Sequence, residues 1–290
     1  MSSCEVVEII TPKRRLLNGL RFGPKTPKRV IIWVHGLGSS AFSKLDIVYK
    51  LTDTNTAVIT FNNRGHDNIS RVIFAGEKRT GKTILGGSAH EVFTECVDDI
   101  EGVINFVKRS GAKNIFLAGH STGCQKSVYW ASKKGGRGVK GIILLAPISD
   151  YSAEMHLQGK GKIERAAEAA RALVARGKKH QLLPDNIWPE HVDAQRFLSL
   201  YTPDSTEEMF TYAQPKKTPY IFRAVKLPIF AIFAANDEYA DRPAEKIAEW
   251  FGRHTRSRKF EMLIVPKAEH SFRKNERVVA TAIKNWIKAL

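Results

Sequence analysis

The pentapeptide Gly119-His120-Ser121-Thr122-Gly123 fits the pattern G-x-S-x-G and is the strongest chemical signal in the chain. It follows the apolar run NIFLA at 114–118 and precedes a helical pattern at 122–134. A serine on a sharp strand-to-helix turn needs small neighbours, because strand and helix backbones approach closely while the hydroxyl projects from the sheet. A turn with a capping serine would carry the same pattern. The strand before and the helix after favour a nucleophile at Ser121.

A serine hydroxyl is a poor nucleophile near neutral pH, so it needs a base that is itself oriented by an acid. In the chain order Ser, Asp, His, the acid follows a late strand, and Asp237 follows the run PIFAIFAA. The base follows the last strand, and His270 lies five residues beyond Val265. We therefore expect Asp237 and His270 to complete a catalytic triad. Other acids that could take the place of Asp237 are Glu238, Asp241 and, as the main alternative, Asp150.

Acyl transfer also needs two N–H donors that stabilise the oxyanion, one after the nucleophile and one in the loop after an early strand. Thr122 follows the nucleophile directly. The sequence His35-Gly36-Leu37-Gly38 follows the strand RVIIWV, and its glycines let the backbone turn inward. We assign the two donors to the backbone amides of Leu37 and Thr122.

A competing motif lies at 76–83, where GEKRTGKT satisfies the phosphate-loop pattern G-x-x-x-x-G-K-[ST]. A phosphate loop requires a buried strand before it and a helix that opens at its lysine. Here only the brief run VIFA precedes, and ILGGSAHE follows, whose adjacent glycines disfavour a helix. We interpret the segment as a basic exposed loop rather than a nucleotide site.

Metal and cofactor motifs are absent from the sequence. His90-Glu91 lacks the second histidine of H-E-x-x-H, and Cys4, Cys96 and Cys124 form no C-x-x-C pair. We expect no metal and no cofactor. Three widely separated cysteines also indicate free thiols in a reducing compartment rather than a disulfide framework.

The elements that must position these residues alternate between short apolar runs and longer helical patterns, which is typical of a mostly parallel sheet flanked by helices. An opening antiparallel pair is predicted at 5–10 and around 16–22, where Asn18-Gly19 is a turn signal. Continuous apolar runs predict strands covered on both faces at 29–34, 57–61, 114–118, 139–145, 228–234 and 260–265. Helices are predicted at 91–109, 122–134, 242–252 and 275–289.

Residues 151–220 interrupt this alternation, since they contain no buried-strand run. They carry a helix-forming stretch at 162–177 and the capping-box pattern Ser205-x-x-Glu208. We therefore expect an α/β core domain formed by 1–150 and 221–290, with 151–220 inserted as a small helical cap.

Forty-six lysines and arginines stand against 29 aspartates and glutamates, which gives the 290-residue chain a formal net charge of +17. Such a charge would suit anionic partners such as nucleic acid. The excess is spread over 1–30, 101–150 and 221–290, so we expect neither a nucleic-acid partner nor a membrane partner. No apolar run is long enough to span a bilayer, and the N-terminus is not a secretory signal. The sequence predicts a cytoplasmic protein and sets no oligomeric state.

The motifs together resemble the α/β-hydrolase superfamily: HGLG after the third strand, FNNRGHD after the fourth, GHSTG at the nucleophile, and AAND and AEHSF for acid and base. GHSTGCQ, GSAHEVFTECVDDI, PISD and FLSLYTPDSTEEMF are similar to the fungal siderophore-esterase group. This chain has Lys126 where that group usually carries an acidic residue, and Tyr151-Ser152 after PISD. The resemblance implies a serine hydrolase of esters with residues 151–220 as its cap.

The sequence thus predicts a cofactor-independent carboxylic ester hydrolase that acts on a small-molecule ester through an acyl-enzyme. The same machinery would serve a thioesterase, a peptidase or an acyltransferase. A non-catalytic ligand-binding protein on the same fold is a further alternative, although no triad member is missing.

Overall fold

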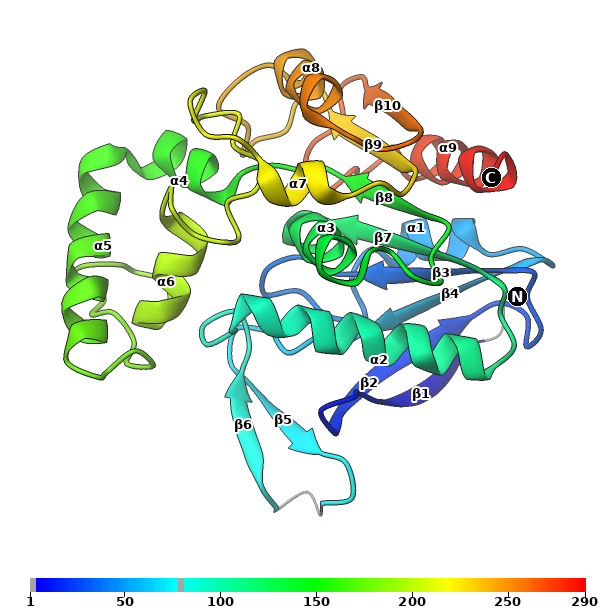
Figure 1. The fold of residues 1–290 in the computed structure, drawn as a ribbon, viewed down its shortest axis with the longest axis horizontal. Helices are drawn as coiled ribbons and strands as arrows, with labels where there is room; N and C mark the ends of the chain where they lie inside the picture. The colour runs from blue at the N-terminus through cyan, green and yellow to red at the C-terminus, as the bar shows by residue number, and fades with distance from the viewer. Residues whose placement is uncertain (1–3, 78–80) are drawn as a thin grey trace.

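The computed structural model describes residues 4–77 and 81–290. The described strands are β1 (Cys4–Ile10), β2 (Arg15–Phe22), β3 (Arg29–Val34), β4 (Thr56–Phe61), β5 (Ser70–Phe74), β6 (Thr83–Gly86), β7 (Asn114–His120), β8 (Gly141–Leu145), β9 (Ile229–Ala234) and β10 (Phe260–Val265). They form one sheet in the order β10-β9-β8-β7-β3-β4-β2-β5-β6, with β1 paired to β2 (Figure 1). Neighbours from β10 to β4 are all parallel. The predicted α/β class is therefore confirmed.

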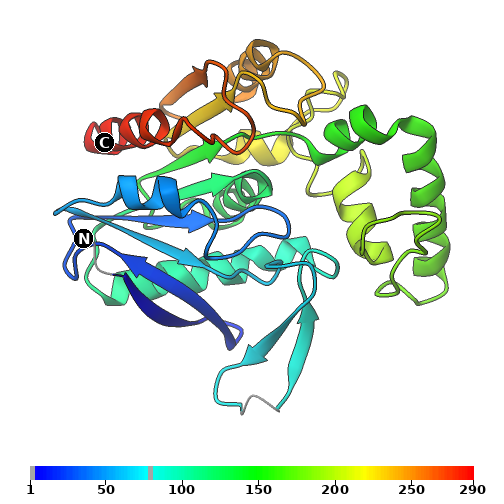
Figure 2. The same cartoon turned by 180° about the vertical axis from the view of Figure 1, so that it is seen from behind.

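Helices cover both faces of this sheet (Figures 1 and 2). They are α1 (Leu45–Leu51), α2 (Cys96–Arg109), α3 (Thr122–Lys134), α4 (Asp150–Gln158), α5 (Lys160–Ala175), α6 (Ala194–Tyr201), α7 (Tyr220–Ala224), α8 (Ala244–His254) and α9 (Glu276–Lys288). Because side chains alternate along a strand, Ile32 of β3 joins an apolar cluster with Val128 of α3, while Trp33 joins another with Ile283 of α9. Two layers of core thus hold β3 and β7 rigid.

The opening pair of antiparallel strands is confirmed, but the interpretation of Asn18-Gly19 as a turn is wrong. Both residues lie inside β2, opposite Glu8 and Val7 of β1, and the chain reverses between Ile10 and Arg15. Gly19 is needed for another reason, because a Cβ there would lie 2.4 Å from the carbonyl oxygen of Thr60 on β4. The glycine permits close approach of a neighbouring strand.

The last strand departs from the expectation that it is covered on both faces. β10 lies at the edge of the sheet, pairs with β9 alone among the described strands, and exposes Glu261 and Met262. Its apolar run reads like a central strand because apolar character alone does not distinguish an edge from the middle of a sheet.

Strands β5 and β6 form an antiparallel hairpin that the sequence did not predict. The phosphate-loop match at 76–83 falls on the turn of this hairpin, of which 78–80 lie outside the described residues. Thr83 begins strand β6 rather than a helix. Among the described residues of the match, Thr83 therefore does not open the helix that a phosphate loop requires.

Helices α4, α5 and α6 lie together outside the two helical layers, beside the carboxyl ends of the parallel strands (Figures 1 and 2). They share an apolar cluster of their own in which Trp188 packs against the rings of Phe197 and Tyr201. Helix α5 covers most of the predicted 162–177 stretch. Among the helices of the described residues, none has both the length and the apolar character needed to cross a bilayer.

The capping-box pattern forms its hydrogen bond without a helix. The Ser205 hydroxyl accepts from the Glu208 amide at 3.1 Å, but no helix follows, so the prediction of a helix start is wrong. The Glu208 carboxylate instead accepts from the Ser149 hydroxyl at 2.7 Å and from Gln214 at 3.2 Å. It ties this stretch to the start of α4, where the Ser149 side chain caps the helix.

A buried ionic network joins α6 to the core. The guanidinium of Arg196, fully buried on α6, lies 2.9 Å from Glu91 and bonds to Glu207 as well. The ammonium of Lys126 on α3, also fully buried, lies 2.6 Å from the other oxygen of Glu91. Although burial alone would raise it, the charges of Lys126 and Arg196 lower the pKa of Glu91. The inserted helices are therefore fastened to the sheet by paired charges as well as by apolar contacts.

Candidate active site

Ser121 is the single residue between β7 and α3, and its backbone has φ 55° and ψ −129°. A non-glycine residue in this region is strained and is held there by its surroundings. The side chain makes no capping hydrogen bond to the helix, which removes the interpretation of Ser121 as an ordinary capping serine. A Cβ on Gly123 would lie 2.1 Å from the carbonyl oxygen of Val34, and one on Gly119 would lie 2.3 Å from that of Gly123. The predicted need for small neighbours is confirmed.

His270 lies in the loop after β10, and Asp237 lies in the loop after β9, as the sequence predicted. The Nδ1 atom of His270 is 2.8 Å from Oδ2 of Asp237, and the other oxygen of Asp237 accepts from the Tyr239 amide at 3.1 Å. Both side chains are largely buried. The structure thus brings together the predicted base and acid, although 33 residues separate them in the chain.

The alternative acids have other partners. Glu238 accepts a hydrogen bond from the backbone amide of His270 at 2.9 Å, which holds the loop rather than the ring. Asp241 pairs with Arg242. Asp150 accepts from Gln125 at 2.7 Å.

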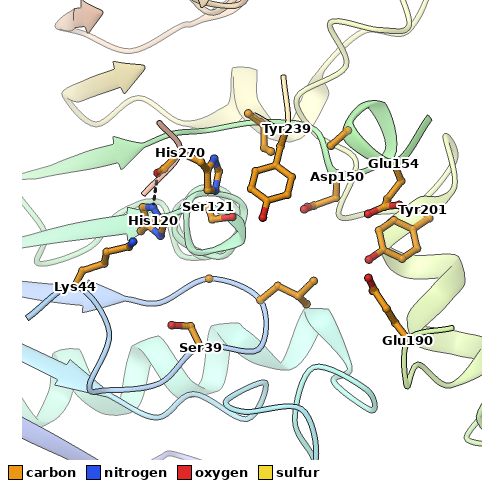
Figure 3. Close-up of a pocket in the computed structure, with 14 residues that line it drawn as sticks. Ser39, Lys44, His120, Ser121, Asp150, Glu154, Glu190, Tyr201, Tyr239 and His270 are labelled. Atoms are coloured by element: carbon orange, nitrogen blue, oxygen red, sulfur yellow. Dashed lines mark hydrogen bonds between the residues drawn. The ribbon is translucent and has the colours of Figure 1, made fainter. Parts of the chain in front are cut away.

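Two further aromatic side chains fix the His270 loop. The ring of Tyr239 packs edge-on against the His270 ring with centroids 4.9 Å apart. His120 donates from Nε2 to the backbone carbonyl of His270 at 3.0 Å (Figure 3). Burial, together with the nearby His270, lowers the pKa of His120 to about 3. The ring is therefore neutral and carries one N–H group, on Nε2.

The loop after β3 is set by a buried histidine. His35 accepts at Nε2 from the Asn63 amide at 3.2 Å, so its proton is on Nδ1, which donates to the carbonyl of Gly36 at 2.8 Å. Burial and the charge of Lys126 lower the pKa of His35 to about 3, which keeps this tautomer neutral. Since the C=O and N–H of one peptide unit point in opposite directions, a fixed Gly36 carbonyl also fixes the Leu37 amide.

The two predicted oxyanion donors have no acceptor among the described residues. Within the described part of the chain, neither the Leu37 amide nor the Thr122 amide donates a hydrogen bond. Thr122 is the first residue of α3, where backbone N–H groups point out of the helix end. Leu37 lines the same cavity as Ser121. Both amides are therefore free to bind an added acceptor.

Ser121 and His270 open into a cavity of about 370 Å³ (Figure 3). Its wall on the core side includes Gly36, Leu37, Ser39, Lys44 and His120. Its opposite wall is formed by the inserted helices and the stretch between them, with Asp150, Ala153, Glu154, Glu190 and Tyr201. The structure thus places the predicted nucleophile and base in one cavity between the sheet and the inserted segment.

Sequence reasoning missed most of this cavity wall, including Lys44, Glu154, Glu190, Tyr201 and Tyr239. Tyr239 had a signal, because it lies two residues beyond Asp237 in the same loop. The carboxylates had none, since solvated acids on helix surfaces look the same in sequence. Across the described residues, no group of three or more histidines, cysteines or acids is arranged to hold a metal ion.

Comparison with solved structures identifies the fold. Over 98% of both chains, Est1E from Butyrivibrio proteoclasticus, solved with ferulic acid bound, matches at a TM-score of 0.64 and 17% identity. A monoacylglycerol lipase from Paleococcus ferrophilus matches at 0.63 and 17%, covering 93% of this chain and 98% of the other. The esterase Pf2001 of Pyrococcus furiosus matches at 0.58 and 14%, covering 99% and 93%. The chain has the α/β-hydrolase fold of these esterases and lipases.

Comparison with known protein sequences identifies a family but no named activity. No curated protein matches the chain. A family model described as "Protein of unknown function (DUF1749)" matches residues 86–289, a range that includes the Ser121 turn, the inserted helices, Asp237 and His270.

Proposed function

Because the chain belongs to the DUF1749 family, whose description names no activity, we propose from the site itself that it hydrolyses carboxylic esters with Ser121 as nucleophile. One observation carries this proposal: Ser121, strained on the strand-to-helix turn, shares a cavity with His270, and His270 lies 2.8 Å from Asp237. The esterase and lipase names of the structural neighbours support it.

In the first half of the reaction, His270 takes the proton of the Ser121 hydroxyl while the serine oxygen attacks the acyl carbon. Asp237 holds Nδ1 of His270 and stabilises the imidazolium that forms. The amides of Leu37 and Thr122 bind the oxyanion of the tetrahedral intermediate. His35 holds the Leu37 amide in position through the Gly36 carbonyl.

In the second half, the C–O bond to the leaving alcohol breaks and His270 returns the proton to that oxygen. Water then attacks the acyl-enzyme with His270 as base, and the acid product leaves with Ser121 restored. No cofactor takes part in these steps. A thioester would react by the same route, as would amide cleavage or acyl transfer to an alcohol.

We further propose that residues 151–220 act as a cap that selects the substrate, since α4 and α6 supply one wall of the cavity. A siderophore ester is the finer substrate proposal, and the sequence resemblance of GHSTGCQ supports it. The cysteines of the described chain are unpaired, which supports a reducing, cytoplasmic compartment.

The direct test is a panel of p-nitrophenyl esters from acetate to palmitate, assayed with the wild type and with Ser121→Ala. We expect hydrolysis of short to medium acyl chains, and a loss of at least about a thousandfold in kcat in the variant, because the nucleophile is gone. Equal activity in both proteins would refute the proposal. A fluorophosphonate probe gives an independent readout: labelling should disappear in Ser121→Ala, and labelling that persists would identify a different nucleophile.

A further inference from the structure

The cavity beside Ser121 is acidic on one side, although the chain as a whole is strongly basic. Three carboxylates, those of Asp150, Glu154 and Glu190, line its cap side (Figure 3). Its one lysine, Lys44, lies on the other side, near His120. A substrate that enters a protein of net charge +17 therefore meets a negative wall opposite the nucleophile.

These carboxylates lack the cationic partners of the acids in the buried ionic network. Glu91 and Glu207 are matched by Lys126 and Arg196. By contrast, none of the three cavity acids forms an ion pair with a described residue, and one oxygen of Glu154 is buried with no hydrogen-bond partner. Asp150 and Glu154 are half-buried and Glu190 is exposed to the cavity mouth, so their carboxylates are available to a cation from outside the chain.

An independent observation comes from Tyr201 on α6. Its side chain lines the cavity and is only 4% exposed, yet its hydroxyl makes no hydrogen bond to any residue that the structure describes. Figure 3 shows this hydroxyl between the ends of Glu154 and Glu190, on the side that faces Ser121. The ring is thus buried while the hydroxyl reaches the cavity without a partner among the described residues, so it is available to a polar group of a ligand.

We propose that this cavity selects esters that carry an ammonium group, with Glu154, Glu190 and Tyr201 as its receptor. The inference rests on the proposed ester hydrolysis at Ser121 and names its substrate class. An ammonium group has three N–H donors, which suits two carboxylates and a phenol oxygen. The rings of Tyr201 and Tyr239 offer further attraction to a cation at the same place.

The ionisation of the cavity acids supports this assignment. Burial and the neighbouring Glu190 raise the pKa of Glu154 to about 7, and burial and Glu207 raise the pKa of Asp150. A bound cation lowers these pKa values, so affinity for it grows as the pH rises through about 7. The titratable and charged groups facing Glu154 from the surrounding elements are Asp150, Lys162, Glu190, Tyr201, Tyr239, Lys44 and His270.

The test compares esters of matched length. On the acyl side, the p-nitrophenyl ester of 6-aminohexanoate is set against the heptanoate ester and the mono-ester of heptanedioate. On the alcohol side, 6-aminohexyl acetate is set against heptyl acetate. We expect kcat/KM for the cationic ester to exceed that of the neutral ester about tenfold in at least one series, with the ratio growing from pH 6 to pH 8. Neutral esters preferred in both series, or the anionic ester preferred, would overturn the proposal.

Substitutions test which residues produce the preference for the cationic ester. The double variant Glu154→Gln with Glu190→Gln should bring the cationic-to-neutral ratio close to one. The double variant Glu164→Gln with Glu168→Gln is the matched control, because it also removes two charges, from the exposed face of α5 outside the cavity. A ratio that survives in the double variant, or that falls equally in the control, would place the selectivity elsewhere.

A binding measurement separates this inference from the proposed catalysis. Calorimetry with Ser121→Ala compares hexylammonium with hexanol as ligands. Tighter binding of hexylammonium, lost in the triple variant that also carries Glu154→Gln and Glu190→Gln, supports the cation site even if no ester is hydrolysed. Hexylammonium that binds no tighter than hexanol refutes it, whatever the hydrolysis assays show.

Discussion

At the scale of single residues, one loop supplies three acids with three different partners. Asp237 faces the His270 ring, Glu238 accepts from the His270 amide, and Asp241 pairs with Arg242. Only the first is placed to choose the tautomer of the ring, since only it contacts Nδ1. The other two hold the loop in shape.

This division predicts unequal effects of matched substitutions. Asp237→Asn should lower kcat for a p-nitrophenyl ester by about 10⁴-fold, because an amide donor favours the wrong tautomer of His270. Asp241→Asn is the control, with the same chemical change in the same loop, and should stay within about threefold of the wild type. Steady-state kinetics at pH 8 measures both effects. Comparable losses of kcat in the two variants would mean that activity depends on the shape of the loop and not on the carboxylate of Asp237.

The positions of Ser121, Asp237 and His270 could be predicted, because each follows a strand and the sheet brings strand ends together at one edge, while their catalytic roles stay a prediction. It could not find Glu154, Glu190 or Tyr201. These come from three parts of the inserted segment whose relative placement depends on tertiary packing around Trp188, and no local pattern encodes that packing.

At the scale of elements, the parallel strands and their helices were predictable because buried apolar runs and helical periodicity repeat over long stretches. The hairpin of β5 and β6 was not, since it is short and mostly half-exposed, with only Val72 buried on β5. The Ser205-x-x-Glu208 pattern failed for another reason. The hydrogen bond from the Glu208 amide to the Ser205 hydroxyl forms locally. The Glu208 carboxylate, however, is buried and accepts a hydrogen bond from Ser149, and no helix continues.

The buried position of Glu208 predicts a pH effect on stability. Burial raises its pKa to about 7 from an ordinary 4.5, against weaker lowering effects of Ser149, Gln214 and Lys217. The folded state therefore keeps a proton that the unfolded chain loses, so this contribution is full below about pH 4.5 and is lost as the pH rises through 7. Glu208→Gln removes the titration and should gain about 1–3 kcal/mol relative to the wild type between pH 5 and pH 8.

Urea unfolding of both proteins at pH 5 and pH 8 measures this gain. Glu168→Gln serves as the control, since its exposed carboxylate should give the same difference from wild type at both pH values. A Glu208→Gln difference that is independent of pH would show that Glu208 is ionised throughout.

At the scale of the whole molecule, the ionic network of Glu91, Lys126, Arg196 and Glu207 joins the inserted helices to the sheet. All four side chains are at most 2% exposed. Removing one partner leaves a buried charge without compensation, which is far more costly than losing an exposed pair. The inserted helices therefore behave as part of the core rather than as a loose appendage.

Arg196→Met should destabilise the protein by about 3–5 kcal/mol and lower its melting temperature by roughly 10 °C, because Glu207 loses its cation. Arg165→Met on the exposed face of α5 is the control and should change the melting temperature by no more than about 2 °C. Calorimetry of the two variants checks this, and similar small shifts in both would mean that the network contributes little to stability.

The same four charges limit how the protein can diverge. Two belong to the sheet domain and two to the inserted segment, and the ion pair of Arg196 with Glu91 joins the two parts. A helical segment transplanted from another α/β hydrolase would bring its own side chains against Glu91 in place of Arg196 and would leave this carboxylate with one cation instead of two. Substitutions at 91, 126, 196 and 207 should consequently be inherited as a set, whereas the cavity residues Glu154, Glu190 and Tyr201 remain free to vary with the substrate.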